Sequence, residues 1–327
     1  PKKDGGVRYL GVPTVADRVA QTVVKMVLEP QLEAHFDPDS YGYRPGKSAK
    51  DAVAATRTRC WKYDWVVEFD IKGAFDNLDH DLMMKALRKH TNCRWILLYV
   101  ERWLQAPVVM ANGEMRTRER GTPQGGVISP LLANIYMNRF LKHWRLSKCS
   151  ETFHAHVVAY ADDFVILSRS RANEALAWTK AVMTRLGLTL NEEKTSLKNA
   201  RQERFDFLGY AFGPHHLGAN GKWYLGASPS KKSVQRFKTK VRKLLVPGNH
   251  DPWPEVGDRL NRSLRGWSGY FSYGTYRRVH RGVDRYVYER VRDFLVRRHK
   301  VAGRGSRRFS TDIVYEELAL LRPERLP

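Results

Sequence analysis

Hydrophobic residues recur along the chain at two spacings, which together predict a mixture of helices and strands. The first helical pattern follows Thr14, a residue type that caps helices. Its apolar face consists of Val15, Val19, Val23, Met26 and Val27. Further helices are predicted at residues 80–87, 95–103, 131–140 and 172–186. Short apolar runs predict strands at 65–71 and 205–212, and residues 157–167 predict a hairpin because two aspartates interrupt two apolar runs.

Two segments rich in glycine and proline are predicted to be loops. Residues 37–47 contain Pro38, Gly42, Pro45 and Gly46, a composition typical of turns and of close approaches between backbone segments. Residues 121–130 come directly before a predicted helix. We therefore expect the unpaired backbone N–H groups at this helix N-terminus to attract an anion.

Charge adds a division of the chain and a class of partner. The 327 residues include 57 Lys and Arg against 34 Asp and Glu, and this length favours two packed units. Residues 226–327 carry 24 basic and 10 acidic side chains, so the positive charge is concentrated in the last third. A surface this cationic usually contacts a polyanion. The change in composition near residues 226–229 predicts a domain boundary there.

Several other classes of protein are excluded or disfavoured. The longest apolar runs are far shorter than the ~20 residues that span a bilayer, so no membrane partner is expected. The three cysteines lie far apart, and the two histidine pairs (154/156 and 215/216) have no further ligand at metal spacing, which argues against a disulfide framework or a zinc site. We expect a cytoplasmic protein in a reducing compartment. The first residue is Pro1, which suggests a start inside a longer chain.

Three aspartates are the strongest candidates for chemistry. Asp162 and Asp163 lie side by side between two predicted strands, where like charges repel unless a cation lies among them. A solvated turn is the alternative, since Asp is common in turns. Asp70 adds a third carboxylate at the end of another predicted strand, with Phe75 five residues later. Three carboxylates from two strands are what a two-magnesium centre for in-line phosphoryl transfer requires.

These residues also resemble a known family, the reverse transcriptases and maturases encoded by group II introns. The sequence YADD at 160–163 is similar to the Y-x-D-D box, and residues 69–76 look like the segment with the first catalytic Asp. Residues 120–134 resemble the nucleotide-contacting loop of the family. Further motifs in the family's order lie at 4–14, 40–46, 187–195, 207–210 and 265–271. The family's first fingers motifs, which would precede Pro1, are absent, and nothing after Arg308 resembles its Cys- and His-bearing endonuclease domain.

The resemblance implies an α+β right-hand polymerase with a palm of antiparallel sheet plus helices, partial fingers and an α-helical thumb. It assigns fingers and palm to residues 1–226 and the thumb, or maturase X domain, to residues 227–302. Residues 303–327 would form a short basic C-terminal tail without an endonuclease domain.

The reaction that the resemblance implies is the addition of dNTPs to a primer 3′-hydroxyl on an RNA template. Asp70, Asp162 and Asp163 would be catalytic and would bind two Mg²⁺ ions, with Mn²⁺ as a substitute. The residues expected to contact the nucleotide are Lys2, Arg8, Phe75, Gln124 and Lys194. Phe75 would lie under the sugar and exclude a 2′-hydroxyl. Core packing remains the alternative for Phe75, a structural turn for Gln124 and a solvated charge for Arg8.

Two further regions are expected to hold nucleic acid. By resemblance, residues 207–210 form a primer grip, a short hairpin whose backbone and ring steady the primer terminus. It consists of Phe207, Leu208, Gly209 and Tyr210, and an ordinary sheet strand is the alternative. The basic side chains expected to contact phosphates of an RNA–DNA duplex or of intron RNA are Lys231, Lys232, Arg236, Lys238, Lys240, Arg242 and Lys243. Trp267, Tyr270 and Phe271 are expected in the thumb core rather than stacked on bases.

The expected partners are an RNA template, a DNA or RNA primer, dNTPs and structured group II intron RNA, which the protein would bind for splicing and retrohoming. One alternative is a domesticated, retron, diversity-generating or CRISPR-associated reverse transcriptase. Another is a non-catalytic RNA-binding splicing cofactor, against which the three aspartates argue. A basic DNA-binding protein of another class is disfavoured because no zinc-finger or basic-zipper pattern is present.

Overall fold

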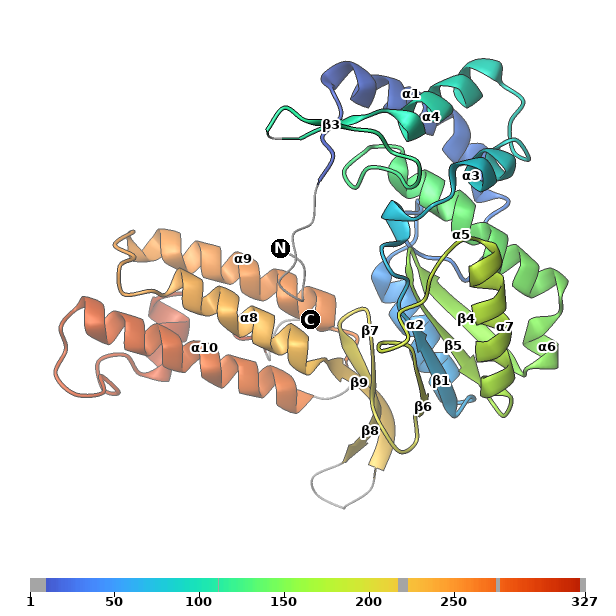
Figure 1. The fold of residues 1–327 in the computed structure, drawn as a ribbon. Coiled ribbons are helices and arrows are strands. Elements are labelled where there is room, and N and C mark those ends of the chain that lie inside the picture. Colours follow the sequence, from blue (N-terminus) through green and yellow to red (C-terminus); the bar gives the residue numbers. More distant parts are fainter. Residues whose placement is uncertain (1–9, 111, 217–222, 275–276, 324–327) are drawn as a thin grey trace. The chain divides into compact units, whose positions relative to one another are not determined.

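The computed structural model describes residues 10–110, 112–216, 223–274 and 277–323, which fold into two compact units (Figure 1). Unit 1 is Pro1–Asn199 and unit 2 is Ala200–Pro327. The helices of unit 1 are α1 (Val15–Glu33), α2 (Ala49–Cys60), the 3₁₀ helix η1 (Ala74–Asp76), α3 (His80–Leu87), α4 (Arg94–Gln105), α5 (Ser129–Leu146), α6 (Cys149–Thr152) and α7 (Ala172–Arg185). Its strands are β1 (Trp65–Phe69), β2 (Val108–Val109), β3 (Met115–Arg116), β4 (Ala155–Tyr160), β5 (Asp163–Ser168) and β6 (Ser196–Asn199).

The centre of unit 1 is an antiparallel sheet of four strands in the order β4-β5-β1-β6. Helix α2 packs against β4 and β5, while α7 packs against β1 and β5. The ring of Phe140 in α5 lies 5.4 Å from that of Phe164 in β5. Because alternate residues of a strand point to opposite faces, the continuous burial of residues 164–168 means that both faces of β5 are covered. The strand predicted at 65–71 is confirmed as β1, and the hairpin predicted at 157–167 is confirmed as the pair β4 and β5.

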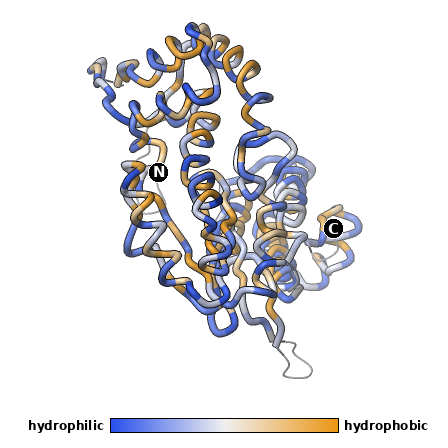
Figure 2. The backbone as a smooth tube through the Cα atoms, turned by 90° about the vertical axis from the view of Figure 1, so that its right-hand side faces the viewer, coloured by the Kyte–Doolittle hydropathy of each residue, from blue (hydrophilic) through white to orange (hydrophobic). Residues whose placement is uncertain are grey.

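Helix α1 begins as predicted, with Thr14 Oγ1 accepting a hydrogen bond from the Asp17 amide at 3.1 Å. Its predicted apolar face, however, is exposed: Val15 is 69 % and Val19 is 60 % exposed. The residues that pack inward are Gln21, Val24, Leu28 and Leu32. The helix thus has two apolar rows, and the hydrophobic stretches of α1 appear at the top of Figure 2. Helical spacing alone did not identify which row is buried.

Unit 2 combines a three-stranded antiparallel sheet with three long helices. Its strands, in the order β7-β8-β9, are β7 (Phe205–Phe207), β8 (Tyr210–His216) and β9 (Trp223–Pro229). Its helices are α8 (Lys231–Leu244), α9 (Trp253–Phe271), α10 (Arg277–Arg298) and the π-helical turn η2 (Ile313–Glu317). The ring of Trp267 lies 5.2 Å from that of Phe237 in α8 and 5.1 Å from that of Phe271. Trp267 and Phe271 are buried, which agrees with the core role expected for them.

The units divide earlier than the sequence suggested. The expected boundary at 226–229 falls inside β9, which pairs along its length with β8, so the compact units separate after Asn199 instead. The expected single strand at 205–212 is a hairpin, because Leu208 and Gly209 both have positive φ (50° and 80°) and form a two-residue turn. The division into fingers, palm and thumb at the expected positions stays a prediction.

The C-terminal segment packs against α9, in contrast to the expected tail. Asn261 donates a hydrogen bond to the Ala319 carbonyl at 2.8 Å and accepts one from the Leu321 amide at 2.9 Å. Trp253 Nε1 donates to the Leu318 carbonyl at 3.2 Å. Among the helices of the described ranges, none is long and apolar enough to span a bilayer.

Candidate active site

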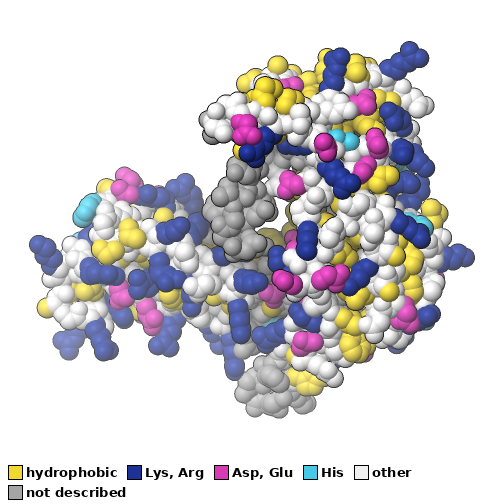
Figure 3. All heavy atoms as spheres, viewed as in Figure 1, with side chains coloured by type: hydrophobic (Ala, Val, Ile, Leu, Met, Phe, Trp, Pro, Cys, Tyr) yellow, Lys and Arg dark blue, Asp and Glu magenta, His cyan; other side chains and the backbone are white. Residues whose placement is uncertain are grey.

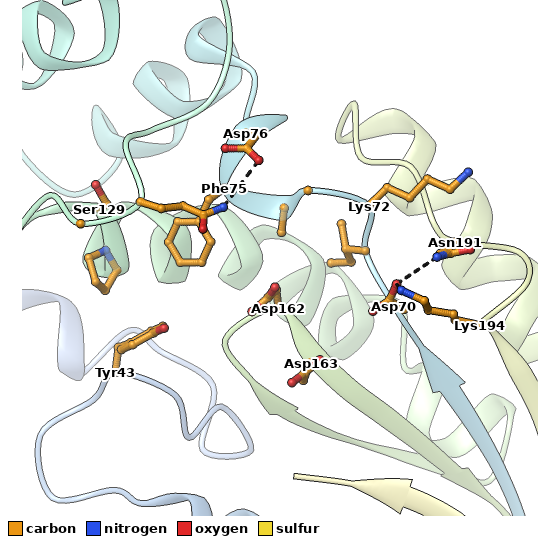
Figure 4. Close-up of a pocket in the computed structure, with 16 residues that line it drawn as sticks. Tyr43, Asp70, Lys72, Phe75, Asp76, Ser129, Asp162, Asp163, Asn191 and Lys194 are labelled. Carbon is orange, nitrogen blue, oxygen red and sulfur yellow. Dashed lines mark hydrogen bonds and ion pairs between the residues drawn. The ribbon is translucent and has the colours of Figure 1, made fainter. Parts of the chain in front are cut away.

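Asp70 follows β1 directly and is fixed by the segment after α7. The Asn191 amide donates to the Asp70 carbonyl at 2.7 Å, and the Lys72 amide donates to the Thr189 carbonyl at 2.9 Å. Asn191 also donates from its side chain to Asp70 Oδ2 at 3.2 Å, and Lys194 Nζ lies 3.4 Å from the same oxygen (Figure 4). Both the backbone and the carboxylate of Asp70 are therefore positioned by Asn191.

Asp162 and Asp163 lie at the tight turn between β4 and β5. Tyr160 pairs with Asp163, so Ala161 and Asp162 form a two-residue turn in which Ala161 has φ 56°. Asp162 is half-buried and Asp163 is exposed. The rigid pairing of the two strands fixes where this turn presents its carboxylates.

The loop at residues 39–43 lies directly against this turn. Tyr41 and Ala159 are joined by a backbone hydrogen bond of 2.8 Å, and the Asn134 side chain donates to the Gly42 carbonyl at 2.9 Å. A Cβ atom on Gly42 would lie 2.3 Å from the Ala161 nitrogen. Only glycine allows this approach, so the close backbone contact predicted for the loop is confirmed.

The loop at 121–130 is held by residues from other parts of unit 1. Gln21, 3 % exposed in α1, accepts hydrogen bonds from the amides of Val127 (2.9 Å) and Ile128 (3.4 Å). The Gln124 carbonyl accepts from the Gly11 amide at 2.8 Å. The amides of Val127 and Ile128, which precede α5, therefore already have a partner, and the anion expected at this helix N-terminus stays a prediction.

These segments line one pocket of about 600 Å³. It brings together the sequence-predicted residues Asp70, Asp162, Asp163, Phe75, Gln124 and Lys194. Tyr43, Lys72, Asp76 and Asn191 line it as well, so its charged side chains are four carboxylates and two ammonium groups (Figure 4). The lining is therefore net negative and favours a bound cation. Lys2 and Arg8 lie outside the described residues.

Phe75 belongs both to the pocket and to the core. Its ring is half-buried, packs against the main hydrophobic cluster of unit 1 and meets the Tyr43 ring edge-on at a centroid distance of 6.5 Å. Gln124 Nε2 lies 3.5 Å from Asp76 Oδ2, a long contact that leaves the amide able to turn toward a ligand. Burial lowers the pKa of Arg118, and the Asp76 carboxylate acts in the opposite direction. Arg118 is thus a further cation close enough to Asp76 to interact with its carboxylate.

The donor set suits a hard divalent cation, because carboxylate oxygens are the ligands that such ions prefer. Within the ranges that the structure describes, no three His, Cys, Asp or Glu side chains converge closely enough to hold a metal ion by themselves. The three aspartates therefore share a pocket, and their chemistry fits a metal ion.

The expected primer grip is the β7–β8 turn of unit 2. Tyr210 is fully buried, and its hydroxyl donates to the Tyr270 carbonyl at 2.5 Å, while the Tyr270 hydroxyl donates to the Leu208 carbonyl at 2.8 Å. Burial raises the pKa of the Tyr210 hydroxyl. The ring of Tyr210 therefore anchors the turn to α9 and cannot itself touch a primer. Leu208 and Gly209 are half-exposed at the turn.

The seven basic residues of α8 do not form a single face. Phe237 and Val241 are buried. On one side of the helix, at spacings of four, four and three, lie Lys232, Arg236, Lys240 and Lys243, and on the other side lie Lys231, Lys238 and Arg242. In the sequence these seven residues form one basic run, whereas on the helix they lie on two different surfaces.

Sequence reasoning missed several supporting residues, among them Gln21, Gly42, Asn134 and Asn191. Asn191 lay in a quoted motif without a role, and Gly42 lay in a loop already predicted to allow close contacts. Nothing in the local pattern signalled Gln21, since a glutamine within a helix is usually exposed.

Comparison with known proteins adds family membership. The family described as reverse transcriptase (RNA-dependent DNA polymerase) matches residues 1–212, and the group II intron maturase-specific domain matches residues 234–310. Protein YkfC of Escherichia coli is 30 % identical over 246 residues, 64 % of this chain and 64 % of that protein. The group II intron-encoded protein LtrA of Lactococcus lactis is 35 % identical over 141 residues, 43 % of this chain and 23 % of LtrA.

The chain thus spans less than two thirds of the length of these curated relatives. A telomerase structure from Candida albicans covers 91 % of this chain and 56 % of its own, with a TM-score of 0.51 at 15 % identity, which speaks for the fold alone. The predicted right-hand polymerase fold is confirmed. From the match over residues 1–212, the chain belongs to the reverse transcriptase family of RNA-dependent DNA polymerases, and it carries the maturase-specific domain of group II introns.

Proposed function

We propose that the protein is an RNA-directed DNA polymerase that adds dNTPs to a primer 3′-hydroxyl, and that it also binds group II intron RNA as a maturase. The observation that carries the proposal is the pocket of unit 1, which is lined by Asp70, Asp162 and Asp163. Its other lining residues include two aromatic rings, two side-chain amides and two lysines, the groups suited to a sugar and a triphosphate.

The reverse transcriptase family implies a divalent metal, and we propose Mg²⁺ with Mn²⁺ as a substitute. Two such ions, when bound, would acidify the primer 3′-hydroxyl and neutralise charge on the triphosphate. Asp70, Asp162 and Asp163 are the proposed ligands. Asn191 keeps the carboxylate of Asp70 oriented through its side-chain amide, which lies 3.2 Å from Oδ2. No protein nucleophile is required.

The remaining pocket residues bind and select the nucleotide. Lys194 is proposed to exchange its ion pair with Asp70 for an oxygen of the triphosphate. Phe75 packs against the hydrophobic core of unit 1, and its ring would contact the sugar of the dNTP and leave no room for the 2′-hydroxyl of a ribonucleotide. Gln124 lies between a proline and two glycines, where the backbone can approach a nucleotide and the amide can bond to it.

Unit 2 is proposed to hold the nucleic acid. The Leu208–Gly209 turn would steady the primer terminus through its backbone, because the ring of Tyr210 is buried. In the part of unit 2 that the structure describes, the basic residues of α8 form no ion pair with an acidic side chain, so their charge is open to phosphates. RNA binding is supported by the maturase-specific domain match.

Primer extension on an RNA template tests the proposal directly. We expect the chain to extend a DNA primer in the presence of Mg²⁺, and Asp162→Asn to lower the rate by at least about 1,000-fold. Asp81→Asn, a change of the same type on the exposed face of α3, should extend at the parent's rate. RNA affinity should be similar in all three proteins, because the substitutions lie in unit 1 and the proposed RNA contacts in unit 2. Substantial synthesis by the Asp162 variant would remove the catalytic assignment.

A further inference from the structure

Unit 2 contains a second cavity, of about 590 Å³, that neither the motifs nor the proposed polymerase site accounts for. It is a groove between the β7-β8-β9 sheet, α8 and α10. Its apolar lining is formed by Ala211, Pro229, Val234, Val279 and Val283. We call it the α8–α10 groove.

Polar and charged groups surround this apolar lining. Lys231, Lys238 and Arg204 contribute three positive charges, and Asp206 contributes one negative charge. Gln235 and Ser228 complete the lining with an amide and a buried hydroxyl. The groove therefore combines an apolar interior with a net positive rim, which is complementary to a ligand with a flat apolar body and an anionic backbone.

The rim is held in place by contacts within unit 2. Lys238 Nζ lies 4.8 Å from the centroid of the Tyr286 ring, and the Tyr286 hydroxyl donates to the Lys238 carbonyl at 3.3 Å, which ties α8 to α10. The guanidinium of Arg204 donates two hydrogen bonds to the Pro214 carbonyl, at 3.2 and 3.1 Å. The groove is thus a formed feature of the unit, with its cations at fixed positions.

We propose that the α8–α10 groove receives an unstacked base of single-stranded RNA while Lys231, Lys238 and Arg204 contact the flanking phosphates. Proteins recognise single-stranded RNA through unstacked bases that are splayed out of the strand and hydrogen-bonded at their edges. The amide of Gln235 and the carboxylate of Asp206 supply a donor and acceptors for a base edge. This inference rests on the proposed RNA-binding function and adds a site to it.

Gly282 allows the groove to be filled without disturbing the fold. It lines the groove from α10, and a Cβ atom added there meets no other atom within 4 Å. Within a helix, tryptophan and alanine are both more favourable than glycine. Gly282→Trp should therefore fill the groove, whereas Gly282→Ala should leave it open and serves as the matched control.

The test compares two probes, a 12-nucleotide oligouridine and an abasic ribose-phosphate oligomer of the same length. The parent chain and Gly282→Ala should bind the oligouridine about tenfold more tightly than the abasic oligomer. Gly282→Trp should lose that difference while keeping its affinity for the abasic oligomer and its melting temperature. Photocrosslinking of 4-thiouridine in the parent should label peptides from residues 228–238 or 279–283, which gives a readout independent of the substitution.

A second pair of variants tests the rim. Lys231→Gln should weaken oligouridine binding and lower its dependence on salt, and it should reduce labelling of the groove. Lys85→Gln, at an exposed position of α3 in unit 1, is the matched control and should not change that labelling. If Gly282→Trp binds both probes as the parent does, the groove is not an RNA site. If Gly282→Trp loses affinity for both probes equally, the groove holds the sugar-phosphate backbone or an acidic protein segment, and the base-binding proposal is wrong. Either result leaves the polymerase proposal intact if the parent chain extends primers normally. A parent chain that does not extend primers would contradict the polymerase proposal instead.

Discussion

Substitution of Gly42 by alanine tests whether the loop at residues 39–43 sets the position of the β4–β5 turn, which carries two of the proposed catalytic aspartates. The new Cβ would lie 2.3 Å from the Ala161 nitrogen and 2.9 Å from the Tyr160 carbonyl carbon, whereas ordinary contacts begin at 3.4 Å. Loop and turn must therefore separate by about 1 Å. Both neighbours are backbone atoms, so no flexible side chain can relieve the overlap. Because the loop is also bonded to β4 and to Asn134, we expect the turn that carries Asp162 to shift.

A misplacement of about 1 Å at a reacting centre can lower a rate by about 100-fold, and overpacking of this kind costs about 1–3 kcal/mol of stability. Single-nucleotide primer extension, measured well below the melting temperature, reports the rate, and thermal unfolding reports the stability. Gly46→Ala is the matched control. Gly46 lies three residues after this loop, has φ +69°, and a Cβ atom added there meets no atom within 4 Å, so the substitution adds backbone strain without pushing on the turn. A Gly42→Ala protein that is folded and extends primers at the parent's rate would refute the reasoning.

Three other substitutions follow from the same site and its surroundings. Asn191→Ala should lower the extension rate about tenfold and weaken Mn²⁺ binding measured directly by electron paramagnetic resonance, because Asp70 loses the amide that orients it; unchanged Mn²⁺ affinity would contradict that role. Phe75→Val should raise incorporation of rNTPs relative to dNTPs about tenfold or more, and an unchanged ratio would return Phe75 to ordinary core packing. Burial, His35 and Lys142 lower the pKa of His90 in the fold, so the unfolded chain takes up a proton more readily. The free energy of unfolding of the parent, measured in urea, should therefore fall as the pH drops below about 6.5, and the fall should be smaller in His90→Gln. An equal pH dependence in the two proteins would contradict this role of His90.

The positions of the three aspartates could be predicted because their signals are local. Asp70 lies near the end of a mostly apolar run, and Asp162 and Asp163 interrupt another, so a strand end and a hairpin turn could be predicted from about ten residues at a time. The pairing of β1 with β5 then brings these local features together. The shared pocket depends on the strand predicted at 65–71 and on the hairpin predicted at 157–167, and both predictions are confirmed.

The supports of the site could not be predicted in this way, because they join residues far apart in the chain. Asn191 and Asp70 are 121 positions apart, Gln21 and Val127 are 106 apart, and Asn134 and Gly42 are 92 apart. Each is a polar contact whose partner depends on how helices and loops pack around the sheet. A motif can mark such a residue, as it did for Asn191, without indicating what it touches.

Burial of helix faces is a second quantity that local spacing leaves open. The exposed and buried rows of α1 are both apolar, so the pattern is compatible with either orientation. Hydrophobic side chains lie on the surface at the top of the view in Figure 3, the end at which Figure 1 places α1. The choice is made by Leu28 and Leu32, which join the main core, and by Gln21, which needs the loop amides as partners.

Helix geometry also limits how many cations of a basic run can contact one nucleic-acid partner. Along the sequence the seven cations of α8 form one block, and counterion release from one nucleic-acid partner would then scale with all seven. On the helix they divide into a group of four and a group of three, and Lys231 and Lys238 of the smaller group line the α8–α10 groove. A rigid duplex lying along one side of α8 can neutralise at most four of them. Two partners, or a single RNA that bends around the helix, are needed to engage both groups, so the salt dependence of binding should differ between duplex and single-stranded ligands.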